Sequence, residues 1–448
     1  MIIDPGQFSC VIHHPSSGRF PGTAEVEAGR DVVVHLYDWP FPDSGTFSPS
    51  DETEPLGNVL CELRVGVHLI LIDAVAHELL PERLLITAPL AIAAPPGFVG
   101  PQSRYFGAEL QITNCHRVFG TWPIHSLEWP KEAADSGTER YLANWDADSK
   151  VEVSLGGNVD LIAEFYRSHS FNDRYRFELQ SRPMFNLSAS EPLSPSTWMA
   201  ERLQPLRELV SLATLEQQRI TIASVAHPDG EMRDSEVEYS LYSRHVDQAP
   251  YAPSADSVHD GQTLFTLRDV ADTAEAILGR WQRFRDDQPG VVEPLVTALT
   301  QPANVRSHFL GLVQSLEGIH SYKFGPGAVT REEHSARRKA VLAEAKATGV
   351  SAESVKWLRK WVDTRGQFRL HERLMQLASD VADDTGSVPG SQLNPDVIAE
   401  IRNGLSHGGA TYSRRDLEPH VRSMAIVGIA QLLGIIGVPP TNISRFFR

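Results

Sequence analysis

The sequence has few of the features that mark secreted, membrane-spanning or zinc-binding proteins. Only three of its 448 residues are cysteines, and no two of them form a Cys-x-x-Cys pair. This scarcity argues against a disulfide framework or a cysteine-based zinc site, and it is typical of proteins in a reducing cytosol. The N-terminus lacks a basic region followed by an apolar stretch, so we expect no secretory signal and a cytoplasmic location.

Long apolar runs are also missing. A membrane-spanning helix needs about 18 to 20 consecutive, mostly apolar residues. The longest candidate, 424–438, is shorter and contains Gln431 and three glycines. We therefore expect this segment to be a buried helix of a bundle, and we expect no membrane partner.

Several familiar catalytic signatures are absent from the sequence. It contains no phosphate-binding glycine loop, no His-Glu-x-x-His, no serine-centred elbow and no kinase motif set. The histidines of the first half show no metal-ligand spacing. We therefore expect no metal site and no cofactor.

The net charge of −16 argues against general binding of nucleic acids, but the charge is unevenly distributed. Residues 331–373 contain 11 Lys/Arg and 6 Asp/Glu, a net charge of +5, so the rest of the chain carries −21. A basic segment in an acidic protein indicates a local anion site. The alternative is a pair of solvated charged helices. Trp357 and Trp361 lie one helical turn apart in this segment; they could stack on bases, but side chains at this spacing more often pack in a core.

The first part of the chain has the pattern of a β-rich domain. Alternating or β-branched runs are bounded by Gly, Pro, Asp and Asn, and proline-containing breaks are expected at 40–57, 81–101 and 123–130. A helix is predicted over 196–215, followed by strands at 219–225 and 235–242 that complete the same sheet. The predicted strands of the first part are 26–36, 59–72, 108–112, 151–165 and 175–179.

From residue 267 onward the pattern is helical. We therefore predict an α+β multidomain protein, with a β-rich domain over 1–265 and an all-α bundle over 266–448. The predicted helices are 269–285, 292–299, 304–322, 331–347, 351–362, 368–382, one beginning after Asn394, and 417–436.

The segment 394–409 carries the most informative pattern. Asn394 is a good N-cap, Pro395 suits the first helical position, and Gly408 can end the helix. One face is apolar (Val397, Ile398, Ile401, Leu405), and the opposite face is polar (Arg402, Asn403, Ser406, His407). Asn403 and His407 are neighbours at i, i+4, but Arg402 and His407 lie about 140° apart around the helix. A partner outside this helix must bring those two together if they act jointly.

The string Arg402-Asn403-x3-His407, at a helix end and followed by glycine, resembles the signature of HEPN domains. These helical bundles often work as metal-independent ribonucleases in which two copies of the motif face each other across a twofold dimer. With its long β-rich front, the chain resembles the ApeA-like anti-phage proteins.

The resemblance implies specific roles and partners. It makes Arg402, Asn403 and His407 catalytic, in a homodimer that cleaves host RNA, with tRNA as a candidate, to 2′,3′-cyclic phosphate and 5′-hydroxyl ends and causes abortive infection. The N-terminal domain would sense a phage-derived trigger. Residues expected to support the site or contact RNA are Ser406, Glu317, Arg359, Lys360, Arg365 and Arg369.

Three alternatives remain open on the sequence alone. The same spacing recurs in Arg30-Asp31-x3-His35, which lies in a predicted strand, and in Arg415-Asp416-x3-His420, at the start of the last helix. Arg402 and His407 would then belong to an ordinary solvated helix face. A second alternative is a non-catalytic HEPN module for dimerisation or nucleotide binding, joined to a ligand-sensing domain. A third is a β-sandwich glycan-processing enzyme, which would need a pair of carboxylates in the front half.

Overall fold

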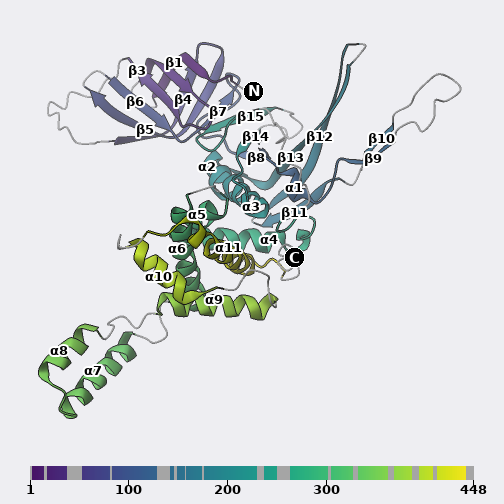
Figure 1. The fold of residues 1–448 in the computed structure, drawn as a ribbon. Coiled ribbons are helices and arrows are strands. Elements are labelled where there is room, and N and C mark those ends of the chain that lie inside the picture. The colour runs from purple at the N-terminus through teal and green to yellow at the C-terminus, as the bar shows by residue number, and fades with distance from the viewer. Residues whose placement is uncertain are drawn as a thin grey trace. The chain divides into compact units, whose positions relative to one another are not determined.

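A computed structural model describes the chain over residues 3–14, 18–37, 53–80, 83–128, 142–145, 149–156, 158–173, 176–229, 237–249, 263–300, 304–325, 331–361, 368–385, 393–406 and 411–439. The chain divides into two compact units, Met1–Gln282 and Arg283–Arg448 (Figure 1). The first is rich in β-strands and the second is helical, as the predicted fold class requires.

The first unit begins with a closed β-barrel of antiparallel strands. Strand β5 is long enough to pair with β4 along one edge, while its other edge pairs first with β7 and then with β6. The pairing of β5 with β6 closes the ring in the order β5-β4-β1-β2-β3-β6. The bounds are β1 (Gly6–His14), β2 (Gly18–Val26), β3 (Val32–Leu36), β4 (Thr53–Leu63), β5 (Val67–Leu80), β6 (Arg83–Ala88) and β7 (Leu90–Ala94).

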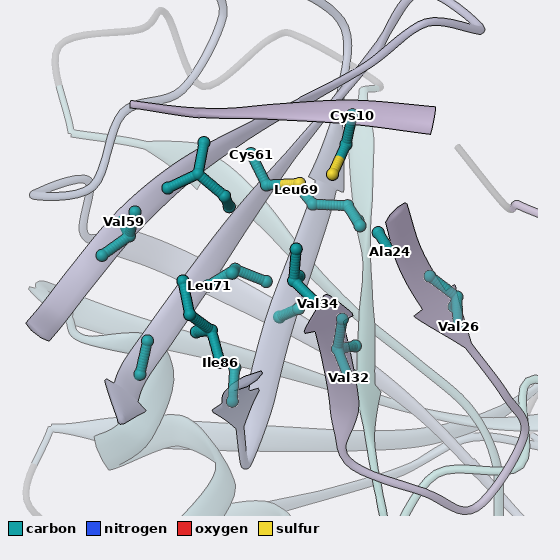
Figure 2. Close-up of a cluster of buried hydrophobic side chains, with 14 of the residues drawn as sticks. Cys10, Ala24, Val26, Val32, Val34, Val59, Cys61, Leu69, Leu71 and Ile86 are labelled. Atoms are coloured by element: carbon teal, nitrogen blue, oxygen red, sulfur yellow. The ribbon is translucent and has the colours of Figure 1, made fainter. Parts of the chain in front are cut away.

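Alternation along each strand fills the barrel with small and branched side chains. In β3, Val32, Val34 and Leu36 are buried and His35 is exposed, which is the period of two expected of a strand with one face inward. Figure 2 shows these valines facing Leu71 and Ile86 in the barrel interior. Closure pairs each strand on both sides, so the ring has no open edge.

Strand β7 carries the sheet out of the barrel into a second antiparallel layer, in the order β7-β15-β14-β8-β13-β12-β11. The predicted strands near 219–225 and 235–242 are β14 and β15, and they complete this sheet as expected. The bounds are β8 (Tyr105–Ile112), β11 (Val151–Gly156), β12 (Val159–Asp173), β13 (Arg176–Leu193), β14 (Ile220–Pro228) and β15 (Glu238–Ser243); a short helix α1 (His116–Phe119) and a separate hairpin, β9 (Ile124–Glu128) and β10 (Leu142–Trp145), lie between β8 and β11.

The helix predicted over 196–215 is present as three consecutive helical pieces, α2 (Pro195–Thr197), a π-helical turn over 198–203 and α3 (Gln204–Thr214). Its fully buried Trp198 donates from Nε1 to the carbonyl of Tyr105 at 3.0 Å. This bond anchors the helical segment to strand β8.

Some predicted strand boundaries were wrong. The run 59–72 is two strands, β4 and β5, joined by a turn at Gly66, whose φ of +79° suits glycine. The run 26–36 likewise contains the end of β2 and all of β3. The predicted break at 81–101 contains β6 and β7. Apolar alternation continues through a tight turn, so periodicity alone does not reveal where a hairpin reverses.

In the second unit, α6 packs against α5, α9 and α11, and α10 packs against α9. Helices α7 and α8 pack against each other. The bounds are α4 (Ala274–Asp287), which crosses the boundary between the units, α5 (Pro289–Thr300), α6 (Val305–Phe324), α7 (Arg331–Ala347), α8 (Ala352–Trp361), α9 (Leu370–Thr385), α10 (Pro395–Ser406) and α11 (Arg414–Ile436).

Helix α11 is long and apolar enough to cross a membrane by length and composition alone, the one such helix in the described part of the chain. However, 61% of its most apolar window is buried inside the protein. This burial matches the bundle helix that the sequence predicted.

A first prediction concerns the close approach of α5 and α6. A Cβ added at Gly318 would clash with the side chain of Val291, whereas one added at Gly311, on the same helix, would lie an ordinary 3.7 Å from Cβ of Ala298. We expect Gly318→Ala to lower the free energy of unfolding by about 1 to 3 kcal/mol through overpacking. Gly311→Ala should instead raise it by about 0.5 to 1 kcal/mol, because alanine favours the helix. Urea denaturation measures both; equal effects of the two substitutions would contradict this packing.

Candidate functional site

Helix α10 positions the motif residues. The side chain of Asn394 accepts a hydrogen bond from the amide of Val397 at 3.3 Å, which confirms the predicted N-cap. Ile398 and Ile401 are buried, and Leu405 is half-buried on the same side. The apolar face predicted from the sequence is therefore the packed face of the helix.

Three of the predicted site residues occupy the last turns of α10. The Arg402 side chain is half-buried at the margin of the packed face, and its Nη1 donates to Oδ1 of Asn403 at 3.4 Å. Asn403 and Ser406 are exposed. Arg402 forms no ion pair with a carboxylate in the part of the chain that the structure describes. His407 lies outside the described residues.

The segment that follows the motif is fixed at its far end. Arg306, in the first turn of α6, donates from Nη2 to the carbonyl of Tyr412 at 3.4 Å. Ser413 then caps α11 in a reciprocal capping box with Asp416, and these hydrogen bonds from Ser413 hold the pKa of Asp416 below its ordinary value. The start of α11, the helix that follows the motif, is thus fixed by defined hydrogen bonds.

The first of the other two strings with the same spacing serves the structure of the front domain. Arg30 forms an ion pair with Glu27 at 2.6 Å, and Asp31 forms one with Arg244 at 2.9 Å. His35 is exposed on strand β3.

The second string lies at the start of α11. Its Asp416 is the capping-box residue, so its carboxylate is already occupied by the amide and hydroxyl of Ser413. In the string at Arg402, by contrast, the side chains of Arg402 and Asn403 form hydrogen bonds only with each other within the described residues.

Glu317, predicted as a supporting residue, is half-buried on α6. Its carbonyl accepts a hydrogen bond from Nη1 of Arg373 at 3.2 Å, and the same nitrogen donates to Oγ of Ser321 at 2.9 Å. The structure therefore places Glu317 at the junction of α6 and α9. No hydrogen bond joins it to Arg402 or Asn403 within the described residues.

A partly buried polar network that sequence reasoning did not identify joins α6, α9 and α11. Lys323 forms an ion pair with Asp380 at 2.5 Å and donates to Oε1 of Gln431 at 2.9 Å. Gln431, almost completely buried, donates in turn to the carbonyl of Leu377 at 2.8 Å. The signal was present in the sequence, since a glutamine inside an apolar run needs a buried hydrogen-bond partner.

His320 extends this polar interface toward the start of α9. Its ring is fully buried between Phe324 and Phe368, with centroid separations of 4.9 and 5.1 Å, and its Nε2 lies 2.6 Å from Oε1 of Gln376. Burial lowers the pKa of His320 below its ordinary value. The neutral ring is thus part of the packed core on which α9, and through it α10, depends.

The basic residues proposed as RNA contacts are separated along the chain. Arg359 is exposed on α8, where its carbonyl accepts from Nη2 of Arg338 on α7 at 2.8 Å. Arg369 is exposed, and its amide donates to Glu372 at 2.7 Å at the start of α9. The side chain of Lys360 and the whole of Arg365 lie outside the described residues.

The expectation that Trp357 packs in a core was wrong. Its side chain is 60% exposed, while Val355 is buried on the same helix. Helices α7 and α8 pack against each other, and Trp357 lies two positions from the buried Val355, so its side chain points away from that contact. Helix α8 therefore carries an accessible indole as well as the exposed Arg359, although positions two apart lie on different faces of the helix.

A second prediction follows from His320. Because burial depresses its pKa in the folded state, the unfolded chain binds the proton first as the pH falls. The contribution of His320 to the stability of the second unit should be complete above pH 6.5, the ordinary pKa of histidine, and should decline as the pH drops from there toward the lower folded-state pKa. His320→Gln, which can still pair with Gln376, should reduce this slope in urea denaturation at a series of pH values. A slope unchanged from the wild type would contradict the assignment.

Two models of known protein families match parts of this chain. A model described as Apea-like HEPN matches residues 310–441, which include α10 and the polar network. A model described as ApeA N-terminal domain 1 matches residues 104–281, which include the second layer of the sheet. No curated protein and no solved structure matches the chain. The chain is an ApeA-like protein with a C-terminal HEPN domain.

Proposed function

We propose that this protein is a metal-independent endoribonuclease that cleaves host RNA, with tRNA as the expected target, when a phage-derived trigger is present. The two matched domains support an anti-phage HEPN effector. Beyond these matches, we propose the RNA cleavage itself, its RNA target and the chemical ends of its products.

The observation that carries the proposal is the environment of Arg402. Its guanidinium is half-buried at the end of α10, with Asn403 as its recorded partner and no carboxylate in ion-pair contact within the described residues. Keeping a charged group partly out of water without a counter-ion is unfavourable. An RNA phosphate supplies that counter-ion and matches the fork of the guanidinium with two parallel hydrogen bonds.

The chemistry requires three events at one phosphodiester. The 2′-oxygen loses its proton and attacks phosphorus, the bond from phosphorus to the 5′-oxygen breaks, and the 5′-oxygen takes up a proton. The products are a 2′,3′-cyclic phosphate and a 5′-hydroxyl. A histidine titrates near neutral pH and can transfer these protons, and a helix C-terminus favours its protonated form. We assign proton transfer to His407 and stabilisation of the phosphorane charge to Arg402, with Asn403 as an orienting group.

A dimer supplies the geometry that one helix does not. Arg402 and His407 are five residues apart, so a regular helix separates their directions by about 140°. In the proposed site, Arg402 of one protomer faces His407 of the other across a twofold axis. This arrangement makes the homodimer the active species.

The hairpin of α7 and α8 is the proposed RNA-holding surface. Arg359 and Lys356 are exposed on α8 next to Trp357, so phosphate contacts and base stacking are available on one helix. A basic hairpin in an otherwise acidic protein restricts RNA to the part of the molecule that carries the nuclease motif.

The first test maps RNA ends in phage-infected cells that express the protein, so that the trigger is supplied. Wild type should produce fragments with cyclic-phosphate and 5′-hydroxyl ends. Arg402→Ala and His407→Ala should each reduce cleavage by at least about 100-fold, because charge stabilisation and proton transfer are each worth that much.

His420→Ala is the matched control, because it removes the histidine of the second string and should leave cleavage unchanged. Cleavage by purified activated protein should continue in EDTA. If only His420→Ala abolished cleavage, the catalytic motif would be Arg415-Asp416-x3-His420 and not the string at Arg402. Absence of cleavage in infected cells would favour the non-catalytic dimerisation or nucleotide-binding module.

The second test separates RNA binding from chemistry. Lys356→Ala combined with Arg359→Ala should weaken RNA binding. It should also make the slope of log K against log salt concentration less steep by about 1 to 2, because each lost phosphate contact removes about one released counter-ion. Lys150→Ala combined with Arg219→Ala, both exposed in the front domain, removes the same charge and should leave the slope unchanged. Filter binding over a salt series measures this; identical slopes for the two double variants would exclude the hairpin as the RNA surface.

A further inference from the structure

A row of polar side chains crosses the second layer of the sheet in the front domain. Asn186 on β13 pairs in register with Glu109 on β8, and Ser224 on β14 pairs with Glu109 from the other side. Ile162 on β12 continues the row beyond Asn186. Residues in register on adjacent strands project from the same face of a sheet, so these side chains lie together.

The next row of the same face is built from very small residues and leaves a hollow. Gly107 pairs in register with Ser188 on one side and with Ala226 on the other. A pocket of about 300 Å³ opens over them, with Phe106 and Leu187 among its apolar lining residues. This is the lower end of the volume range of small-ligand sites.

His227 reaches over this hollow because its backbone is left-handed. Its φ is +54°, which is unusual for a residue other than glycine, and its Cδ2 lies 3.4 Å from the position that a Cβ of Gly107 would occupy. The ring lines the pocket. Its Nδ1 is buried and has no hydrogen-bond partner within the described residues, so the pocket holds a polar atom that a ligand can satisfy.

Glu109 lines the pocket, and two further glutamates, Glu164 and Glu238, lie close to it. The hydroxyl of Tyr166 lies 2.9 Å from Oε1 of Glu109 and 3.0 Å from Oδ1 of Asn186. The amide nitrogen of Asn186 donates to Glu164 at 2.5 Å, and Ser224 donates to Glu238 at 3.1 Å.

Three glutamates on three strands therefore act on one small region. Neither Glu109 nor Glu164 has a lysine or arginine ion-pair partner in the described ranges. No group of three acidic, histidine or cysteine side chains there has the arrangement of a metal site.

The crowding has an electrostatic consequence. Burial and the negative charge of Glu238, with a smaller contribution from Glu164, raise the pKa of Glu109 to about 7. The hydrogen bond from Tyr166 acts in the opposite direction but is outweighed. A proton thus partly neutralises the cluster at neutral pH, and a bound cation would take over that role.

We propose that this pocket binds an organic cation, a guanidinium or ammonium group on an alkyl stem, with the stem over the apolar floor near Gly107 and the charged head against Glu109. The carboxylate of Glu109, on a strand that flanks Asn186, accepts hydrogen bonds from the head. This ligand site shares no residue with the nuclease motif, so the test of ligand binding does not depend on the proposed RNA cleavage.

Isothermal titration calorimetry of the full chain tests the proposal with two probes, agmatine and the capped peptide acetyl-Gly-Arg-Gly-amide. We expect saturable binding that is up to about tenfold tighter near pH 8 than near pH 6, because the cation displaces the proton of Glu109. Titrations in buffers of different ionisation enthalpy should show proton release. Agmatine binding alone assigns the pocket to free amines, and peptide binding assigns it to an arginine side chain of a protein. Binding of neither probe would overturn the proposal.

Variants locate the binding. Glu109→Gln should weaken it by at least about tenfold and abolish proton release, because a carboxylate and its charge are lost. Gly107→Val should fill the hollow and weaken binding; a Cβ there meets its neighbours at ordinary contact distances of 3.4 Å or more. Glu191→Gln, exposed on β13, is the matched control and should bind as the wild type does. Undiminished binding by a folded Glu109→Gln or Gly107→Val variant would rule out this pocket.

Discussion

The packing of Ile398 and Ile401 fixes the rotation of α10 about its axis, and the functional account depends on that rotation. Burying two isoleucines contributes about 1.5 to 3 kcal/mol each, far more than any polar contact that the helix makes at its surface. With this face inward, Arg402 must lie at the margin and Asn403 in solvent. In any regular helix, residues five positions apart point about 140° away from each other, so the proposed mechanism needs a second chain to complete the site.

The helices around α10 are held in one arrangement by contacts that tolerate little displacement. The contact of Gly318 with Val291 fixes how closely α5 and α6 approach. The ion pair of Lys323 with Asp380 and the buried amide of Gln431 then fix α9 and α11 against α6. The buried amide of Gln431 is stable only with its partners in place, so a shift of one helix would leave it unsatisfied. These contacts also determine where α10 lies, because α10 packs against α9.

Local patterns carried most of what the sequence could predict. The N-cap at Asn394, the apolar face of α10 and the alternation of Val32 and Val34 follow from residues close together in the chain, and the structure confirms them. Hairpin reversals were missed because alternation does not stop at a turn.

Long-range features were beyond such patterns. The partners of Gln431 lie more than 50 residues away, and the pocket row brings Glu109 together with Asn186 and Ser224 from three strands. Only the strand order makes these residues neighbours. The front domain therefore holds a candidate ligand site that no sequence motif indicates.

The central claim is that Arg402 and His407 act together across a dimer, and mixed dimers test it most directly. Differently tagged Arg402→Ala and His407→Ala chains would be co-expressed, and the doubly tagged heterodimer would be purified and assayed on RNA after activation. A composite site predicts that two inactive chains regain one working site per heterodimer, and thus about half of the wild-type activity, as two-site symmetry requires. A heterodimer that forms but remains as inactive as either parent would contradict the shared site.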